Sequence, residues 1–108
     1  MTTNRGAIAG LDKRVTPARP DLAAAYLRGV VTAPRYVEGE ARRVVVDATP
    51  LRSEPNPEHG YDTQVLYGEA VQVYEFDEEG WAFVQLDRDR YVGYVSANAL
   101  APVDVKFT

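Results

Sequence analysis

The stretch that decides the fold is residues 66–86, LYGEAVQVYEFDEEGWAFVQL. It contains two runs of alternating residues, 71–73 and 81–86, and the acidic segment 77–80 between them ends in glycine. An acidic run that ends in glycine favours a tight turn between two strands. Successive side chains of a strand point to opposite faces. In the second run, Ala82, Val84 and Leu86 therefore share one face, and Trp81, Phe83 and Gln85 share the other. The stretch therefore predicts two short strands with one face directed at a core.

Further short strands are expected on both sides of this stretch. The expected strands are β-branched or apolar runs bounded by turn residues, at 44–46, 63–67, 91–95 and 103–107. A long loop rich in proline and glycine, 53–62, interrupts the series, and 96–100 predicts a single helical turn. Five to six strands at this spacing predict an all-β fold, a small half-open barrel over residues 41–108.

The N-terminal part of the chain has a different composition. Residues 1–10 are small and polar, and we expect them to be disordered. Residues 11–40 predict an extended arm with one short helix of about nine residues, which begins at Pro20 and ends at Gly29. Leu22 and Tyr26 would share one face of that helix. A helix this short is marginal alone, so we expect it to pack on the barrel.

Composition excludes several classes of protein. The 108 residues suffice for one domain, and the absence of cysteine removes disulfides, thiolate metal sites and thiol nucleophiles. Residues 1–52 carry nine Lys/Arg against five Asp/Glu, a net +4, whereas residues 53–108 carry three against eleven, a net −8. An acidic half repels phosphate backbones, so nucleic acid is not an expected partner. The acidic surface either favours a cationic ligand such as a peptide amine or simply keeps the chain soluble.

The chain offers no expected membrane segment. No apolar run approaches the roughly 20 residues that a membrane-crossing helix needs. Residues 1–10 contain no hydrophobic stretch typical of a signal peptide. We therefore expect a soluble, cytoplasmic location and no membrane partner.

Specific residues in this order resemble an SH3 domain. Residues 66–73 resemble the diverging turn, with a leucine, then glycine and an acid, then alternating valines, and Trp81 begins the next strand as in SH3-like domains. Residues 93–100 resemble the end of eukaryotic SH3 domains, but Ser96 replaces a proline and Ala99 a tyrosine of the groove that binds proline-rich peptides. That groove needs aromatic walls, so polyproline recognition is not expected.

The closer resemblance is to bacterial SH3 domains at the N-terminus of NlpC-type cysteine peptidases, which hydrolyse murein peptides. The resemblance runs from Leu11 to Pro102 and is carried by five segments, 14–23, 27–29, 62–69, 79–82 and 91–95. Arg90 departs from the glycine that related domains often have in this turn, which suggests a different turn geometry or a lost ligand contact.

No catalytic site is expected within the chain. The related peptidases use a cysteine nucleophile and a histidine base, whereas this chain has no cysteine and a single histidine, His59, in the proline- and glycine-rich loop. One histidine and scattered carboxylates give no metal-ligand spacing, so we expect no metal and no cofactor. Any catalytic domain would lie on sequence outside these 108 residues.

The resemblance implies a binding role beside the cleft of an NlpC-type catalytic domain. A domain placed there would narrow the cleft and meet the free N-terminal end of a murein stem peptide of the L-Ala-γ-D-Glu-diamino acid type. An ammonium ligand needs a carboxylate and aromatic walls. Candidate ligand-binding residues are the acids and aromatics near the long loop and the late strands: Glu54, Glu58, Tyr61, Asp62, Trp81, Tyr91 and Tyr94, with Phe83 as a further wall.

Each candidate also has a purely structural interpretation. Trp81 and Tyr94 can be half-buried residues of the fold, and Phe83 can be covered by the N-terminal helix. Asp62 can bond to nearby backbone, and His59 can be a simple loop residue. Two alternative functions stay open: an independent peptidoglycan- or protein-binding module, and a structural module whose aromatics form a permanent interdomain contact. The sequence leaves open the choice of ligand-binding acid and the oligomeric state.

Overall fold

The computed structural model describes residue 12 and residues 14–56 and 61–103, and of Tyr61 and Asp62 only the backbone. The regular secondary structure of these described residues consists of nine strands and two 3₁₀ helices. In chain order the elements are β1 (Ala23–Ala24), η1 (Ala25–Leu27), β2 (Tyr36–Val37), β3 (Glu40–Val44), β4 (Ala48–Arg52), β5 (Tyr61–Leu66), β6 (Ala70–Phe76), β7 (Trp81–Leu86), β8 (Val92–Ser96), η2 (Ala97–Ala99) and β9 (Leu100–Pro102).

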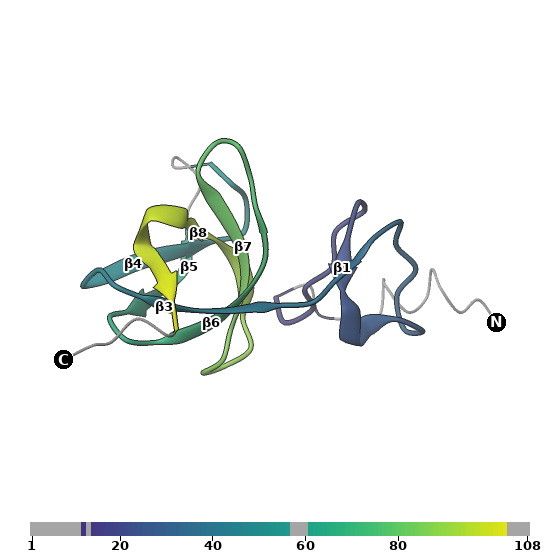
Figure 1. Ribbon diagram of the computed structural model, residues 1–108, viewed down its shortest axis with the longest axis horizontal. Helices are drawn as coiled ribbons and strands as arrows, with labels where there is room; N and C mark the ends of the chain where they lie inside the picture. Colours follow the sequence, from purple (N-terminus) through teal and green to yellow (C-terminus); the bar gives the residue numbers. More distant parts are fainter. Residues whose placement is uncertain (1–11, 13, 57–60, 104–108) are drawn as a thin grey trace.

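The larger sheet has seven strands in the order β5-β4-β8-β7-β6-β3-β9, and it curls into a half-barrel (Figure 1). Its neighbouring strands pair antiparallel. The contact between β4 and β8 is a single residue pair, Arg52 with Tyr94, so the barrel is only partly closed there. The all-β, SH3-like half-open barrel predicted from the sequence is confirmed.

The sheet has one more strand than the upper expected number, because β4 was not predicted. Thr49 and Leu51 alternate inward along β4, but Pro50 lies between them, and a proline within a run argues against a strand. The structure tolerates Pro50 because β4 pairs with β5 on one side and reaches β8 only at Arg52. The missing N–H of Pro50 therefore removes no bond to β8.

The strand bounds differ from the expected ones at both ends of the barrel. Of the expected strand at 44–46, only Val44 belongs to β3. The last described strand, β9, ends at Pro102, and most of the expected strand at 103–107 lies outside the described residues. The single helical turn expected at 96–100 is present as η2.

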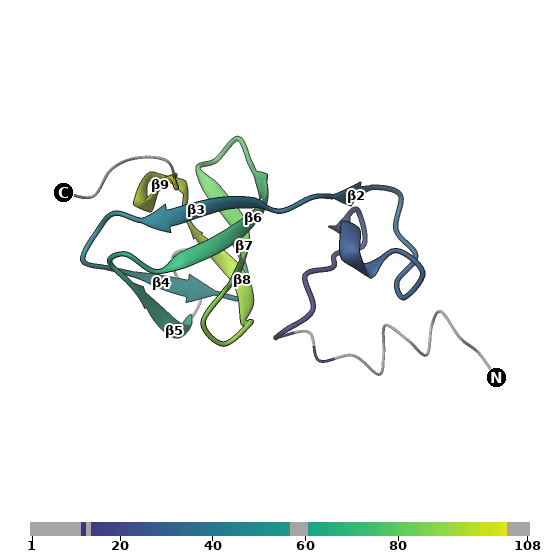
Figure 2. The same ribbon diagram turned by 60° about the horizontal axis from the view of Figure 1, so that its bottom comes forward.

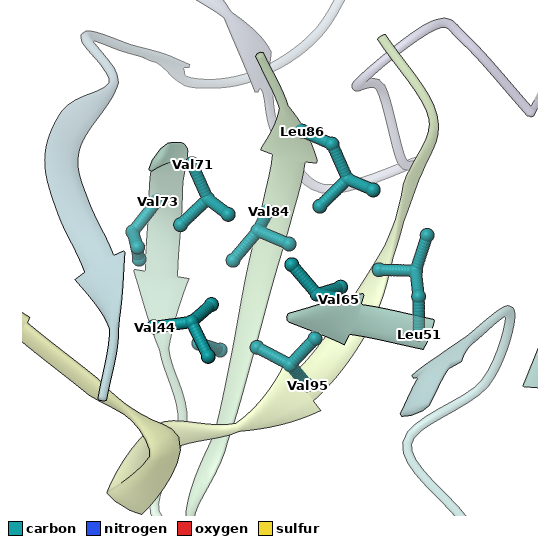
Figure 3. Packing of buried hydrophobic residues seen from close by; sticks show 9 residues of the cluster. Val44, Leu51, Val65, Val71, Val73, Val84, Leu86 and Val95 are labelled. Atoms are coloured by element: carbon teal, nitrogen blue, oxygen red, sulfur yellow. The ribbon is translucent and has the colours of Figure 1, made fainter. Parts of the chain in front are cut away.

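The barrel core consists of fully buried aliphatic side chains that point toward one another across the curled sheet (Figure 3). Its members are Val44, Leu51, Val65, Val71, Val73, Ala82, Val84, Leu86 and Val95. The expected alternation along β7 is confirmed, since Ala82, Val84 and Leu86 all belong to this cluster.

The turns follow the sequence signals. Gly68 adopts φ +87°, and the Glu69 carboxylate accepts a hydrogen bond of 2.9 Å from the Leu66 N–H, which holds the chain in the diverging turn. Arg90 adopts φ +69°, the left-handed conformation in which glycine is favoured. Arg90 thus holds a backbone conformation that glycine adopts without strain, and its effect relative to the turn of related domains stays a prediction. The Arg90 carbonyl accepts a hydrogen bond from the Gln85 amide at 3.0 Å.

The predicted N-terminal helix is wrong. In its place the chain forms the short strand β1, which pairs in parallel with β2, followed by the three-residue η1. Backbone bonds from distant segments take the donors that a helix would use: the Ala23 N–H donates to the Arg35 carbonyl and the Ala24 N–H to the Pro17 carbonyl, both at 3.0 Å. These bonds override the intrinsic helix propensity of the alanines. Leu22 is buried while Tyr26 is 55% exposed, so the two do not share a face.

The segment from residue 12 to residue 39 packs beside the barrel, and the chain from β2 to β3 joins the two parts (Figures 1 and 2). A second buried cluster joins Leu22, Ala23, Ala24, Leu27 and Val31 of this segment to Tyr74, Phe83 and Val92 of the barrel. The expectation that the N-terminal segment covers Phe83 is therefore confirmed, although the covering element is not a helix.

Gln85, on the outer face of β7, ties the N-terminal segment to the barrel. Its side chain is 1% exposed, and its amide donates to the Val15 carbonyl at 3.2 Å and accepts from the Tyr26 hydroxyl at 3.0 Å. The Val92 N–H donates to the Arg14 carbonyl at 2.7 Å. A buried amide is stable only when its polar atoms are paired, so the N-terminal segment is part of the folded domain and not a linker.

A charged cluster around Arg19 makes the second attachment. Arg19 donates to both oxygens of Asp21, at 2.9 and 2.7 Å, and to Glu75 of β6 at 2.5 Å, and Arg35 lies 3.3 Å from the other Glu75 oxygen. Burial lowers the pKa of Arg19, but the bonds to Asp21 and Glu75 outweigh it and hold this pKa above its usual value. The hydrogen bond from Arg19 lowers the pKa of Asp21 below its usual 3.8.

Replacing Leu86 with alanine tests the barrel core. Leu86→Ala removes a fully buried side chain, and we expect it to lower the free energy of unfolding by about 2–5 kcal/mol. The matched control is Leu66→Ala, at a leucine that is 49% exposed, where we expect a change within about 0.5 kcal/mol. Urea unfolding followed by tryptophan fluorescence measures both. Equal losses in the two variants would contradict the assigned core.

The Asp21 contact predicts a pH dependence of stability. Because the folded-state pKa of Asp21 is lowered, its contribution is present above the usual 3.8 and is lost as pH falls through the lower folded value. Asp21→Asn should therefore unfold more easily than wild type at pH 7, and the difference should shrink below pH 4. Urea unfolding from pH 2 to pH 7 measures it, with Asp87→Asn at an exposed turn as control. A difference that persists unchanged at pH 2 would argue against the contact.

Candidate functional site

A pocket of about 560 Å³ lies where the N-terminal segment meets β8 and the loop after β4. Its lining combines charged, aromatic and small residues from these three places and from β7: Arg14, Thr16, Ala18, Arg19, Pro20, Asp21, Ser53, Glu54, Phe83, Val92, Gly93 and Tyr94. Half of the wall therefore comes from the N-terminal segment, so the pocket depends on the docking of that segment.

The structure brings two of the predicted ligand-binding residues, Glu54 and Tyr94, into this pocket together with Phe83. Tyr91 is half-buried and packs against the barrel core instead. Trp81, the first residue of β7, is paired with Ser96 of β8 and does not line the pocket.

The remaining predicted residues belong to the second part of the long loop and to β5. Glu58 lies outside the described residues. Tyr61 and Asp62 are backbone positions of β5 whose side chains are not described. A role for these three residues stays a prediction.

One of the two aromatic rings that line the pocket is already covered by an arginine side chain of the chain itself. The Phe83 and Tyr94 rings lie 5.1 Å apart between centroids, and the Arg19 guanidinium carbon lies 4.8 Å above the centre of the Phe83 ring. Phe83 is only 4% exposed. Its ring therefore stacks with the chain's own cation, whereas no cation of the described residues lies over the Tyr94 ring.

Tyr94 carries a neutral hydroxyl at physiological pH. Burial raises the pKa of Tyr94 above 10, and the hydrogen bond from Arg19 opposes that rise without cancelling it. The Glu54 carboxylate acts on the same phenol and disfavours its ionisation, so the two side chains are electrostatically close. The pocket thus holds an uncharged phenol beside a carboxylate.

The charges that line the pocket differ in how they are paired. Arg19 is paired with Asp21 and Glu75, and Arg14 with Asp12 at 3.2 Å. Glu54 is exposed, and its carboxylate has no hydrogen-bond or ion-pair partner among residues 14–56 and 63–103. An unpaired carboxylate at a pocket rim suits a cationic group.

Sequence reasoning missed the contribution of the N-terminal segment to the site. Arg19 and Asp21 lie within the expected helix and arm, and their partners Glu75 and Tyr94 are 56 and 75 residues away from Arg19. Asp21 two residues after Arg19 is a weak local signal for an ion pair. No local pattern places that pair on Phe83.

The structure offers no metal centre among the residues it describes, because no three histidine, aspartate or glutamate side chains gather there. No described helix is both long and apolar enough to cross a membrane. The cytoplasmic location stays a prediction.

Comparison with known proteins supports the fold seen here. Residues 51–100, a little under half of the chain, match the family model of the bacterial dipeptidyl-peptidase SH3 domain. The solved structure of NlpC2 from Trichomonas vaginalis is similar with a TM-score of 0.53 and 21% sequence identity, over 58% of this chain and 23% of that chain. At this identity the likeness shows the fold. A search of curated proteins found no match.

The family match begins within β4 and ends at the first residue of β9, so it covers most of the curled sheet. The resemblance inferred from the sequence is thereby confirmed for this part of the chain. Residues 51–100 of the barrel are thus similar to the SH3 domain of bacterial dipeptidyl-peptidases.

Proposed function

We propose that this chain is the non-catalytic SH3 domain of a murein peptide hydrolase and that its pocket contacts the free N-terminal end of a murein stem peptide. The family match and the NlpC2 likeness support an association with a peptidase. The chain spans 23% of NlpC2, so the activity of a whole enzyme belongs to this proposal. With no cysteine in the 108 residues, a thiol nucleophile would have to come from a separate Cys–His domain, whose cleft this barrel would narrow.

The observation that carries the proposal is the Glu54 carboxylate at the rim of the pocket, beside Tyr94. The other acids near the site, Asp21 and Glu75, already bind Arg19. A peptide ammonium supplies the charge that Glu54 lacks and can lie against the Tyr94 ring. The pocket volume of about 560 Å³ falls in the usual range for small-molecule sites.

A permanent interdomain contact is the second candidate function. Three large hydrophobic side chains are exposed at the turn β3–β4, at the end of β5 and at the turn that follows it: Val46 at 37%, Leu66 at 49% and Tyr67 at 56%. The two turns adjoin, since the Tyr67 N–H donates to the Asp47 carbonyl at 3.1 Å. Concentration-dependent self-association that Tyr67→Ser abolishes would favour this candidate over peptide binding.

An NMR titration of the ¹⁵N-labelled chain tests the first proposal. We expect L-Ala-γ-D-Glu-diaminopimelate to shift the signals of pocket residues such as Ser53, Glu54 and Gly93, and the N-acetylated peptide to leave them unchanged. Glu54→Gln should weaken binding about tenfold or more, because it removes a charge-assisted hydrogen bond.

The matched control for this titration is Glu78→Gln. Glu78 is an exposed acid in the turn between β6 and β7 and does not line the pocket, so the variant should bind as wild type does. Equal binding of the free and acetylated peptides would contradict amine recognition.

A further inference from the structure

We infer that Arg19 fixes the Tyr94 hydroxyl as a hydrogen-bond donor, so that the pocket selects an ammonium with a carbonyl oxygen next to it over a simple alkyl amine. The inference rests on the proposed function, because it assumes that Glu54 binds the ammonium. It assigns Arg19 as a positioning residue and Tyr94 as a specificity-determining residue.

Whether the Tyr94 hydroxyl donates or accepts a hydrogen bond is set by its partner, Arg19. An Arg19 guanidinium N–H donates to the Tyr94 oxygen at 3.3 Å. A guanidinium has donors and no acceptor, so the Tyr94 oxygen must accept in this contact, and its own hydrogen must be donated elsewhere. The structure shows no acceptor for that hydrogen among residues 14–56 and 63–103. The half-buried hydroxyl therefore presents an unused donor to the pocket.

Arg19 cannot easily turn away from Tyr94. Its side chain is 17% exposed, its guanidinium stacks on Phe83, and it is bound by three carboxylate oxygens of Asp21 and Glu75. A guanidinium held in several directions at once keeps its geometry, because any rotation breaks more than one charge-assisted bond. The donor character of Tyr94 is thus set before a ligand arrives.

The two ligand-facing groups of the pocket are then complementary to one kind of chemical group. Glu54 provides an anionic acceptor and Tyr94 provides a neutral donor, and the two act on each other electrostatically. In an N-terminal residue of a peptide, the ammonium and the carbonyl oxygen are close neighbours, joined through the α-carbon and the carbonyl carbon. The amine of a lysine side chain has no such carbonyl. The site therefore favours an α-aminoacyl end.

Three probes separate this inference from the proposed function. They are L-Ala-γ-D-Glu-diaminopimelate, its N-acetyl form, and an (E)-alkene isostere that keeps the amine but lacks the first peptide carbonyl. We expect wild type to bind the parent peptide about 5- to 10-fold more tightly than the isostere, as one hydrogen bond allows. Tyr94→Phe should lose this preference while it still discriminates against the acetylated peptide.

The outcomes distinguish the two claims. A carbonyl preference that persists in Tyr94→Phe contradicts the specificity role of Tyr94 and leaves amine recognition standing. Binding that acetylation does not change, or no binding of any probe, contradicts the proposed function and the inference with it.

The positioning role of Arg19 has its own readout, the titration of the ¹³Cζ signal of Tyr94. Arg19→Gln removes a contact that lowers the pKa of Tyr94, so we expect the titration midpoint to rise while that of Tyr74 stays unchanged. Simple detachment of the N-terminal segment would instead expose Tyr94 to water, and its midpoint would fall. A lower or unchanged midpoint would overturn the role assigned to Arg19.

Discussion

The contact of Arg19 with Phe83 is the interaction on which the rest of the structure depends. Phe83 sits on the outer face of β7, where an uncovered ring would be exposed to water, and the guanidinium lies 4.8 Å above it. A cation on an aromatic face gains most when both are removed from water, and here the charge is also balanced by Asp21 and Glu75. The same contact docks the N-terminal segment, covers one side of the aromatic pair and forms one wall of the pocket.

The close approach of β4 to β8 is the second constraint on the site. A side chain at Gly93 would place its Cβ 2.5 Å from the Arg52 carbonyl, so only glycine allows the two strands to meet there. Because Ser53 and Glu54 follow β4 directly, this approach also brings them beside Tyr94, which follows Gly93. A single small residue thus allows both the partial closure of the barrel and the placement of Glu54 at the pocket.

The attachment of residues 12–39 combines polar and apolar contacts. Gln85 has its amide paired by Val15 and Tyr26, while Leu22 and its neighbours cover the apolar surface around it. Buried polar groups that are fully paired specify one docking geometry, because any shift leaves a donor or acceptor without a partner. The pocket can therefore keep a defined shape although half of its wall comes from a segment with little regular structure.

The sequence alone determined the barrel, its turns and the two faces of β7. Those features depend on alternation, glycine and acidic turn residues, which act between close neighbours in the chain. It also pointed to Glu54 and Tyr94 as ligand-facing residues, but it could not choose them over Trp81 and Tyr91. All four have polar or aromatic side chains that suit a ligand, and only the approach of β4 to β8, together with the docking of the N-terminal segment, places the first two in one pocket.

Only the tertiary structure decided the form of the N-terminal segment and the role of Arg19. The run of alanines after Leu22 has high helix propensity, but bonds to the Arg35 and Pro17 carbonyls hold its backbone extended. Propensity is worth less than about 1 kcal/mol per residue, and a set of tertiary hydrogen bonds with a buried apolar face outweighs it. The partners of Arg19 are brought together by the fold from distant positions, so no local pattern could reveal them.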